Sequence, residues 1–113
     1  MEVRKLSEEE GEKIAEEGYA GVKSLMVMPE RKDLSGFSCR VFRIEPKGHT
    51  SMHSHEREHV VLVMKGVCKI ECEAECQEVD EGDFIYIKPG LKHKFSNPKD
   101  RTLALFIMNL HLK

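Results

Sequence analysis

The sequence predicts an all-β protein, an antiparallel sandwich or barrel preceded by a short N-terminal helical arm. Two observations support this fold class. From about residue 22 onward, short runs with strand periodicity alternate with turns rich in Gly, Pro and Asp. The chain has 113 residues, 40% of them hydrophobic and 34% charged, which is the size and composition of one globular domain. We therefore divide it into an arm, residues 1–21, and a β-barrel domain, residues 22–113.

The elements follow from local patterns in chain order. A helix is expected over residues 7–17, because Ser7 can cap it, Glu10 follows three positions later, and acidic residues crowd its first turn. Gly18 and Gly21 end that helix, which is polar almost all round, so the arm is expected to be mobile or lightly docked. Strands are expected at residues 21–28, 37–45, 58–64, 67–72, 76–79, 83–87, 91–97 and 102–112.

Charge and composition exclude several classes of partner. The net charge is −2 and no basic block stands out, so we expect no nucleic-acid partner. No apolar run is long enough for a membrane helix, and the charged N-terminus lacks the apolar segment of a signal peptide. We expect a cytoplasmic protein that does not interact with membranes.

Four cysteines raise the question of disulfides or a metal cluster. Three of them, Cys68, Cys72 and Cys76, are spaced four apart, which is not the spacing of a zinc or iron–sulfur site. On a strand, Cys68 and Cys72 share one face with Ile70, which favours buried thiols that act as small hydrophobic side chains. The sequence leaves open a bridge between Cys72 and Cys76 across a turn.

Histidines are concentrated in the stretch "HSHEREH", residues 53–59. His53, His55 and His59 have the same parity, so in an extended segment their side chains leave one face. Neutral imidazole is the commonest metal ligand, and a shared ion would remove the cost of crowding three of them. The alternative is a solvated polar turn. His93 follows a Pro-Gly turn and alternates with two lysines, so it can face inward as a fourth ligand.

Two spaced patterns surround these histidines. Residues 47–66 fit the pattern G(X)5HXH(X)3,4E(X)6G at His53, His55 and Gly66. They depart from it twice, because Lys47 stands at the first glycine and His59 at the glutamate.

Residues 82–97 fit the pattern G(X)5PXG(X)2H(X)3N, with Lys88 in place of the first proline and with His93 and Asn97 in register. Together the two patterns resemble those of the cupin superfamily, and in particular small single-domain (cupin type 2) metal-binding proteins with a four-histidine site. The resemblance implies a cupin jelly-roll barrel, also called a double-stranded β-helix. It also implies one divalent metal ion held by His53, His55, His59 and His93.

Four neutral ligands leave a divalent ion with its full charge and with open positions, so the substrate is expected to be a small anionic or oxygen-chelating molecule. Manganese, iron, cobalt or nickel suits such a site best, and zinc is compatible with it. Candidate residues of the substrate pocket are Arg40, Phe42 and Phe95. Arg40 has the opposite strand parity to Cys39 and Val41, so it can reach the cavity and hold a carboxylate with two hydrogen bonds. The alternatives are a surface position for Arg40 and simple core packing for the two phenylalanines.

Strand 60–64 is apolar on both faces. Val61 and Val63 share the face of His59 and should point into the barrel, whereas Leu62 and Met64 lie on the opposite face. A strand that is apolar on both sides is covered on both sides, and similar cupins are commonly homodimers. We expect a homodimer.

The reaction that we expect first is that of a metal-dependent, dioxygenase-like oxygenase acting on a small chelating substrate. An isomerase or cyclase that uses the ion without redox chemistry is the alternative, and strict independence from dioxygen would favour it. A non-catalytic binding or sensing module is a third possibility. The fold by itself does not decide whether the chain is an enzyme, and no catalytic residue beyond the metal ligands is assigned.

Overall fold

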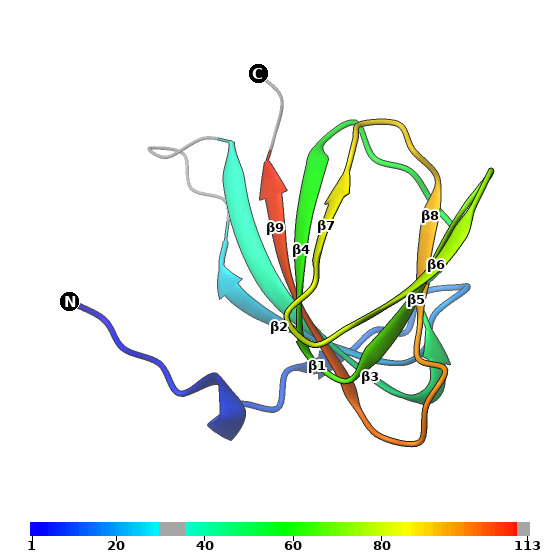
Figure 1. Cartoon of the computed structure of the whole chain (residues 1–113). Helices are drawn as coiled ribbons and strands as arrows, with labels where there is room; N and C mark the ends of the chain where they lie inside the picture. Colours follow the sequence, from blue (N-terminus) through cyan, green and yellow to red (C-terminus); the bar gives the residue numbers. More distant parts are fainter. Residues whose placement is uncertain (30–35, 111–113) are drawn as a thin grey trace.

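A computed structural model describes residues 1–29 and 36–110, which form a single antiparallel sheet of nine strands that curls around an interior (Figure 1). The elements are the 3-10 turn η1 (Leu6–Glu8) and the strands β1 (Glu12–Lys13), β2 (Ala20–Met28), β3 (Phe37–His49), β4 (Glu58–Lys65), β5 (Val67–Cys72), β6 (Cys76–Asp80), β7 (Phe84–Ile87), β8 (His93–Ser96) and β9 (Leu103–Leu110). The all-β jelly-roll fold class is thereby confirmed. Residues 111 and 112 of the last expected strand lie outside the described residues.

The strand order brings together segments that are far apart in the chain. The main path of the sheet is β6-β5-β8-β3-β9-β4-β7, with β2 paired to β3 and β1 paired to β2. Strand β9 lies between β3 and β4 and pairs with both along most of its length. The interior is therefore closed only when β9, near the end of the chain, pairs with β3 and β4, which come much earlier in the sequence.

The expected helix over residues 7–17 is wrong, because the structure has the three-residue turn η1 and the two-residue strand β1 there instead. Gly11 has φ 79°, and a Cβ on it would lie 2.8 Å from the Ser24 carbonyl oxygen, so this glycine packs tightly against β2. The Arg43 guanidinium donates to the carbonyl oxygens of Leu6 and Glu9, and the expected helix would have used the Glu9 carbonyl for its own hydrogen bonds. Tertiary contacts therefore override the local helical signal, and the arm is docked along the sheet. The boundary of the arm at residue 21 stays a prediction.

The alternation expected in β4 is confirmed. His59, Val61 and Val63 face the interior with exposed fractions of 7%, 0% and 1%, whereas Leu62 and Met64 on the other face are 43% and 41% exposed. The interior core is apolar and continuous, and it is formed by Val22, Ile44, Val61, Val63, Cys68, Ile70, Ile87, Phe95, Leu103, Leu105 and Ile107.

Lys47 occupies the position of the first glycine of the histidine pattern, and its φ is 67°. This left-handed conformation is the one that glycine adopts without steric cost, which explains why the pattern has glycine there. Lys47 adopts this conformation despite its side chain, and β3 continues past it to His49, just before the histidine loop.

The cysteines are free thiols. Cys76 pairs with Glu71 across the hairpin, so strand alternation places it on the face opposite to Cys72, which is unfavourable for a bridge between them. Cys68 is fully buried, as expected, and burial raises the pKa of its thiol to about 12. No helix among the described residues is long and apolar enough to cross a membrane.

Candidate metal centre

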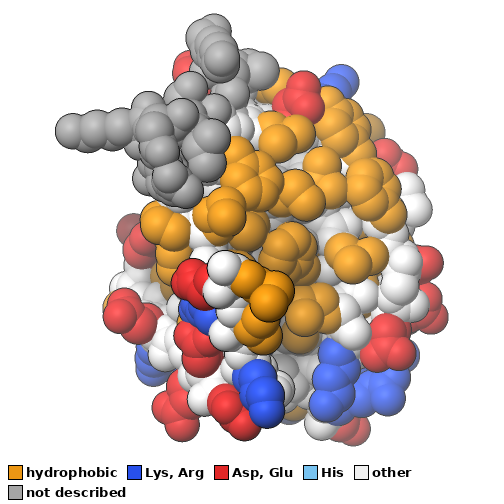
Figure 2. Space-filling view, turned by 90° about the vertical axis from the view of Figure 1, so that its left-hand side faces the viewer, with side chains coloured by type: hydrophobic (Ala, Val, Ile, Leu, Met, Phe, Trp, Pro, Cys, Tyr) orange, Lys and Arg blue, Asp and Glu red, His pale blue; other side chains and the backbone are white. Residues whose placement is uncertain are grey.

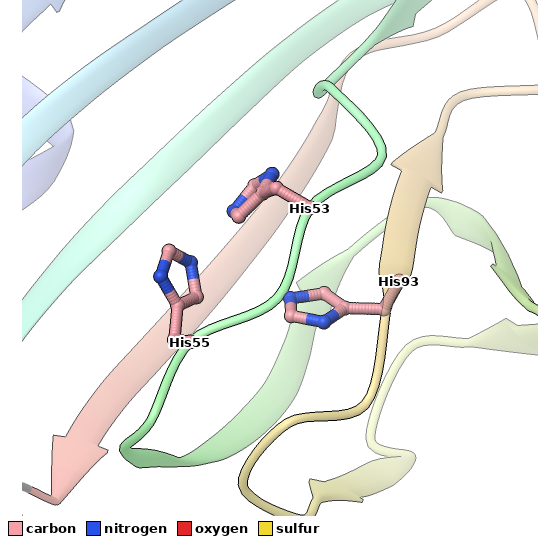
Figure 3. A group of neighbouring side chains, drawn as sticks. All are labelled: His53, His55 and His93. Atoms are coloured by element: carbon pink, nitrogen blue, oxygen red, sulfur yellow. The ribbon is translucent and has the colours of Figure 1, made fainter.

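Three histidines converge at one end of the interior. His53, His55 and His93 each offer a ring nitrogen, and these nitrogens all lie within 4.8 Å of one another (Figure 3). His53 and His55 belong to the loop between β3 and β4, and His93 is the first residue of β8. Two backbone hydrogen bonds between His53 and His93, of 3.1 and 3.0 Å, hold the loop against β8. The shared parity of His53 and His55 correctly indicated that their side chains lie together, although the two residues lie in a loop rather than on a continuous strand.

Backbone carbonyls set the tautomer of two of these rings. The Nδ1 of His53 lies 2.8 Å from the Ser51 carbonyl oxygen, and the Nδ1 of His93 lies 2.8 Å from the Leu91 carbonyl oxygen. A carbonyl only accepts, so each Nδ1 carries the proton and donates it. The Nε2 lone pair of each ring is then available as a ligand, which is the usual arrangement of histidines that bind metals.

The cluster favours neutral imidazole. Burial, assisted by the neighbouring histidines, lowers the pKa of His55 to about 4 and that of His59 to about 3. Burial also lowers the pKa of His93. Since only the neutral ring binds a metal, these rings are in the ligand form at neutral pH.

His59 lies beside the group of three. Its ring centroid is 4.7 Å from that of His55 and 5.4 Å from that of His93. Asn109 on β9 is its cross-strand neighbour. Its Nε2 is buried and has no hydrogen-bond partner among the described residues. A buried nitrogen without a partner is costly, and an ion that His59 also reached would satisfy it. The residues present therefore fit a divalent metal ion.

The histidines open onto a cavity of about 220 Å³. The three pocket candidates from the sequence, Arg40, Phe42 and Phe95, line this cavity. The cavity is also lined by residues that the sequence patterns did not indicate, namely Glu16, Tyr19, Thr50, Arg57, Ile107 and Asn109. Asn109 had a detectable signal, because it is a polar residue at an inward position of the apolar strand β9. No local pattern marks Glu16 or Tyr19, which reach the cavity only through the path of the arm.

The arrangement can bind a small molecule at two kinds of group. Imidazole nitrogens face one end of the cavity, and the guanidinium of Arg40 lines it as well. Phe42, Phe95 and Ile107 supply apolar walls between them. Small-molecule sites commonly combine apolar walls with a few fixed polar groups in this way.

Known proteins share this fold and pattern. The sequence profile described as "Cupin domain" matches residues 40–109. The chain is 28% identical over 95 residues to a 1-methylthio-D-xylulose 5-phosphate methylsulfurylase from Rhodospirillum rubrum, covering 82% of this chain and 60% of that protein. It is also 36% identical over 64 residues to a much longer protein from Vibrio cholerae, covering 55% of this chain and 14% of that one.

Two solved structures resemble the whole fold. The polyketide cyclase RemF from Streptomyces resistomycificus superposes with a TM-score of 0.85 at 22% identity, over 97% of this chain and 79% of that one. A cupin-like protein from Thermotoga maritima superposes with a TM-score of 0.83 at 21% identity, over 90% and 78% of the two chains. With the family profile covering most of the barrel and both histidine patterns within it, this chain belongs to the cupin superfamily.

Proposed function

We propose that this cupin is a metal-dependent enzyme that acts on a small, oxygen-chelating organic substrate. One observation supports this most strongly. Three imidazoles meet within 4.8 Å at the wall of a small cavity, and a fourth buried imidazole beside them has an unpartnered Nε2. We assign the ligand role to His53, His55 and His93, with His59 as the fourth ligand. Manganese, iron, cobalt or nickel is favoured, and zinc is compatible with the same nitrogen donors.

A divalent ion at this site supplies stabilisation of negative charge on substrate oxygens and, if it is redox-active, access to dioxygen chemistry. The protein supplies the surroundings. Backbone carbonyls fix the rings of His53 and His93, and the apolar walls limit water around a bound substrate. The reaction that we propose first is oxygenation of the substrate.

A second candidate is an isomerase or cyclase reaction without redox chemistry. The similarities favour it, because RemF is described as a cyclase and the relative from Rhodospirillum rubrum as a methylsulfurylase. Both candidates need the same metal site and differ in whether dioxygen is consumed.

The experiment is elemental analysis of untagged protein, comparing the wild type with the His53→Ala/His93→Ala double variant. About one metal ion per chain in the wild type, lost in the variant, is the expected result. Oxygen uptake during turnover of chelating substrates then favours the oxygenase, and turnover that is equal without oxygen favours the isomerase or cyclase. A wild type that holds no metal even after reconstitution would contradict both and favour a binding or sensing module.

We further propose that the chain forms a homodimer through the outer face of the sheet. Cross-strand neighbours form two uncharged rows there, Phe84, Leu62, Phe106 and Val41 in one and Tyr86, Val60, Met108 and Cys39 in the other. Phe84 is 64% exposed and Tyr86 52%. Figure 2 shows hydrophobic side chains gathered over a broad area of one face. A second copy offers the same apolar surface, so a two-fold pair would cover both. The cytoplasmic location expected from the sequence stays a prediction.

A further inference from the structure

Two buried side-chain nitrogens lack a hydrogen-bond partner among the described residues, the Nε2 of His59 and the Nε of Arg40. Both residues line the same cavity. A metal ion would satisfy the histidine, but it would repel the guanidinium. Since arginine stays charged at any ordinary pH, Arg40 needs an acceptor, preferably an anionic one. None of the ion pairs formed within residues 1–29 and 36–110 involves Arg40.

The sheet register places Arg40 at a distance from the histidines that a small molecule can span. Arg40 on β3 lies opposite Ile107 of β9, and Ile107 lies opposite Val61 of β4. His59 is two residues from Val61 on the same inner face. With about 4.8 Å between strands and about 3.4 Å per residue, the Cα atoms of Arg40 and His59 are roughly 10–12 Å apart. Both side chains line the cavity, so one small molecule in it can contact both.

The lining of the histidine cavity carries more cations than carboxylates. Arg57 lines it as a second cation, and exposed Glu16 is the one carboxylate among the lining residues. Arg40 also borders a second hollow beside the arm, which Glu9, Glu10 and Glu12 line, but none of the ion pairs among the described residues joins Arg40 to them. Half-buried Tyr19 hydrogen-bonds with Ser51 and lies with its ring centroid 6.2 Å from that of His53. The positive charge of Arg40 acts to lower the pKa of both Tyr19 and His55, so its guanidinium is near enough to both to interact with them.

We propose that Arg40 forms a carboxylate-binding subsite, so that the substrate carries a carboxylate on Arg40 and its chelating oxygens at the histidine cluster. A guanidinium presents parallel N–H donors that match the two oxygens of a carboxylate. Phosphate sites commonly add a helix N-terminus or a nest of backbone amides, and the described residues contain no α-helix. A cavity of about 220 Å³ restricts the ligand to a small acid.

The placement of chelating oxygens at the histidines rests on the proposed metal site. The binding of a carboxylate by Arg40 can be tested without that site. Zinc-loaded and metal-free protein are titrated by calorimetry, at constant ionic strength, with L-malate and (S)-2-hydroxybutyrate. Both probes have the same α-hydroxy acid group, and malate has a carboxylate where the other has a methyl group. The variants are Arg40→Met, Arg40→Lys as a second form that keeps the charge, and Arg101→Met, which removes an exposed cation far from the cavity. Zinc content and thermal unfolding are measured for each variant.

The wild type is expected to prefer malate by roughly 10- to 100-fold, the usual effect of hydrogen bonds between charged groups. Arg40→Met should abolish this preference, Arg40→Lys should reduce it, and Arg101→Met should keep it, all with unchanged zinc content. If folded, zinc-loaded Arg40→Met keeps the full preference, the subsite is overturned while the metal site stands. If the wild type binds no zinc, the metal site fails, and the metal-free titration decides the subsite. Binding of either acid that Arg40→Met abolishes supports the subsite, and the absence of any binding that depends on Arg40 overturns it.

Discussion

The two faces of the sheet around β4 differ in what they leave unsatisfied: buried polar atoms on the inner face and exposed apolar surface on the outer face. On the inner face, Val61 and Val63 are almost fully buried. What is lacking there is a hydrogen-bond partner for single buried nitrogens, such as the Nε2 of His59. On the outer face, none of the buried polar atoms identified as unpartnered in residues 1–29 and 36–110 is found, but Leu62 and Phe84 leave a large apolar area open to solvent.

The difference shows that the two faces need different kinds of partner. An unpartnered buried nitrogen needs an atom of suitable charge at a defined position, such as a metal ion or a carboxylate. An exposed apolar surface needs only cover of matching shape, and the driving force grows with the area removed from water. A ligand therefore fits the interior and a protein partner fits the exterior.

The largest contrast is expected between the losses of stability when a leucine is truncated on the inner face and when one is truncated on the outer face. Leu105→Ala removes a fully buried side chain from the interior and should lower the free energy of unfolding by about 3 kcal/mol. Leu62→Ala removes a side chain that is 43% exposed on the outer face and should cost less than about 1 kcal/mol. Urea unfolding at low protein concentration, where a dimer contributes least, measures both. Equal losses would show that the two faces are packed alike.

The next effect concerns the inner polar end. If His59 is a ligand, His59→Leu should weaken zinc binding roughly 100-fold, since residues that merely support ligands already change metal affinity by about 10- to 100-fold. His49→Leu is the matched control, because His49 is not among the residues that line the cavity. Competition with a chromogenic zinc chelator measures the affinities. Unchanged affinity in His59→Leu would restrict the site to the three histidines that meet within 4.8 Å.

The outer face is tested by placing a charge in its centre. Leu62→Lys should convert the proposed dimer into a monomer, because an uncompensated ammonium would be buried between the copies. Light scattering coupled to size-exclusion chromatography gives the mass. Lys92→Glu changes an exposed residue outside the two apolar rows and should leave the mass unchanged. A wild type that is monomeric at all concentrations would overturn the proposal of a dimer.

A further effect is expected from acid acting on the inner face. The pKa values of His55 and His59 are lowered in the folded protein to about 4 and about 3, from 6.5. Below pH 6.5 the unfolded chain therefore binds more protons than the folded one, so stability falls as the pH is lowered from about 6.5 towards 4. The urea midpoint of metal-free protein at pH 7, 6 and 5 measures this loss. His59→Leu should make the urea midpoint depend less on pH. A wild-type midpoint that does not change with pH would show that the lowered histidine pKa values do not affect stability.

The sequence predicted much of this molecule because the relevant signals are local. Alternation along β4 placed Val61 inside and Leu62 outside, since successive side chains on a strand point to opposite faces. Fixed spacing around His53 and His93 identified the histidine patterns and with them the cupin barrel. The same alternation led to Arg40 as a pocket residue, and Arg40 does line the cavity.

Tertiary structure alone decided the path of the arm and the composition of the cavity. The capping signal at Ser7 predicted a helix, but the arm instead pairs with β2 and contacts Arg43, which is 34 residues from Glu9 in the sequence. Tyr19 and Glu16 join the histidines for the same reason. The unpartnered nitrogens of Arg40 and His59 are a property of packing, because a polar atom lacks a partner only once the surrounding chain has excluded water from it. Periodicity and spacing thus determine strands and candidate ligands, whereas the demand for a particular ligand arises from how those strands close around a shared interior.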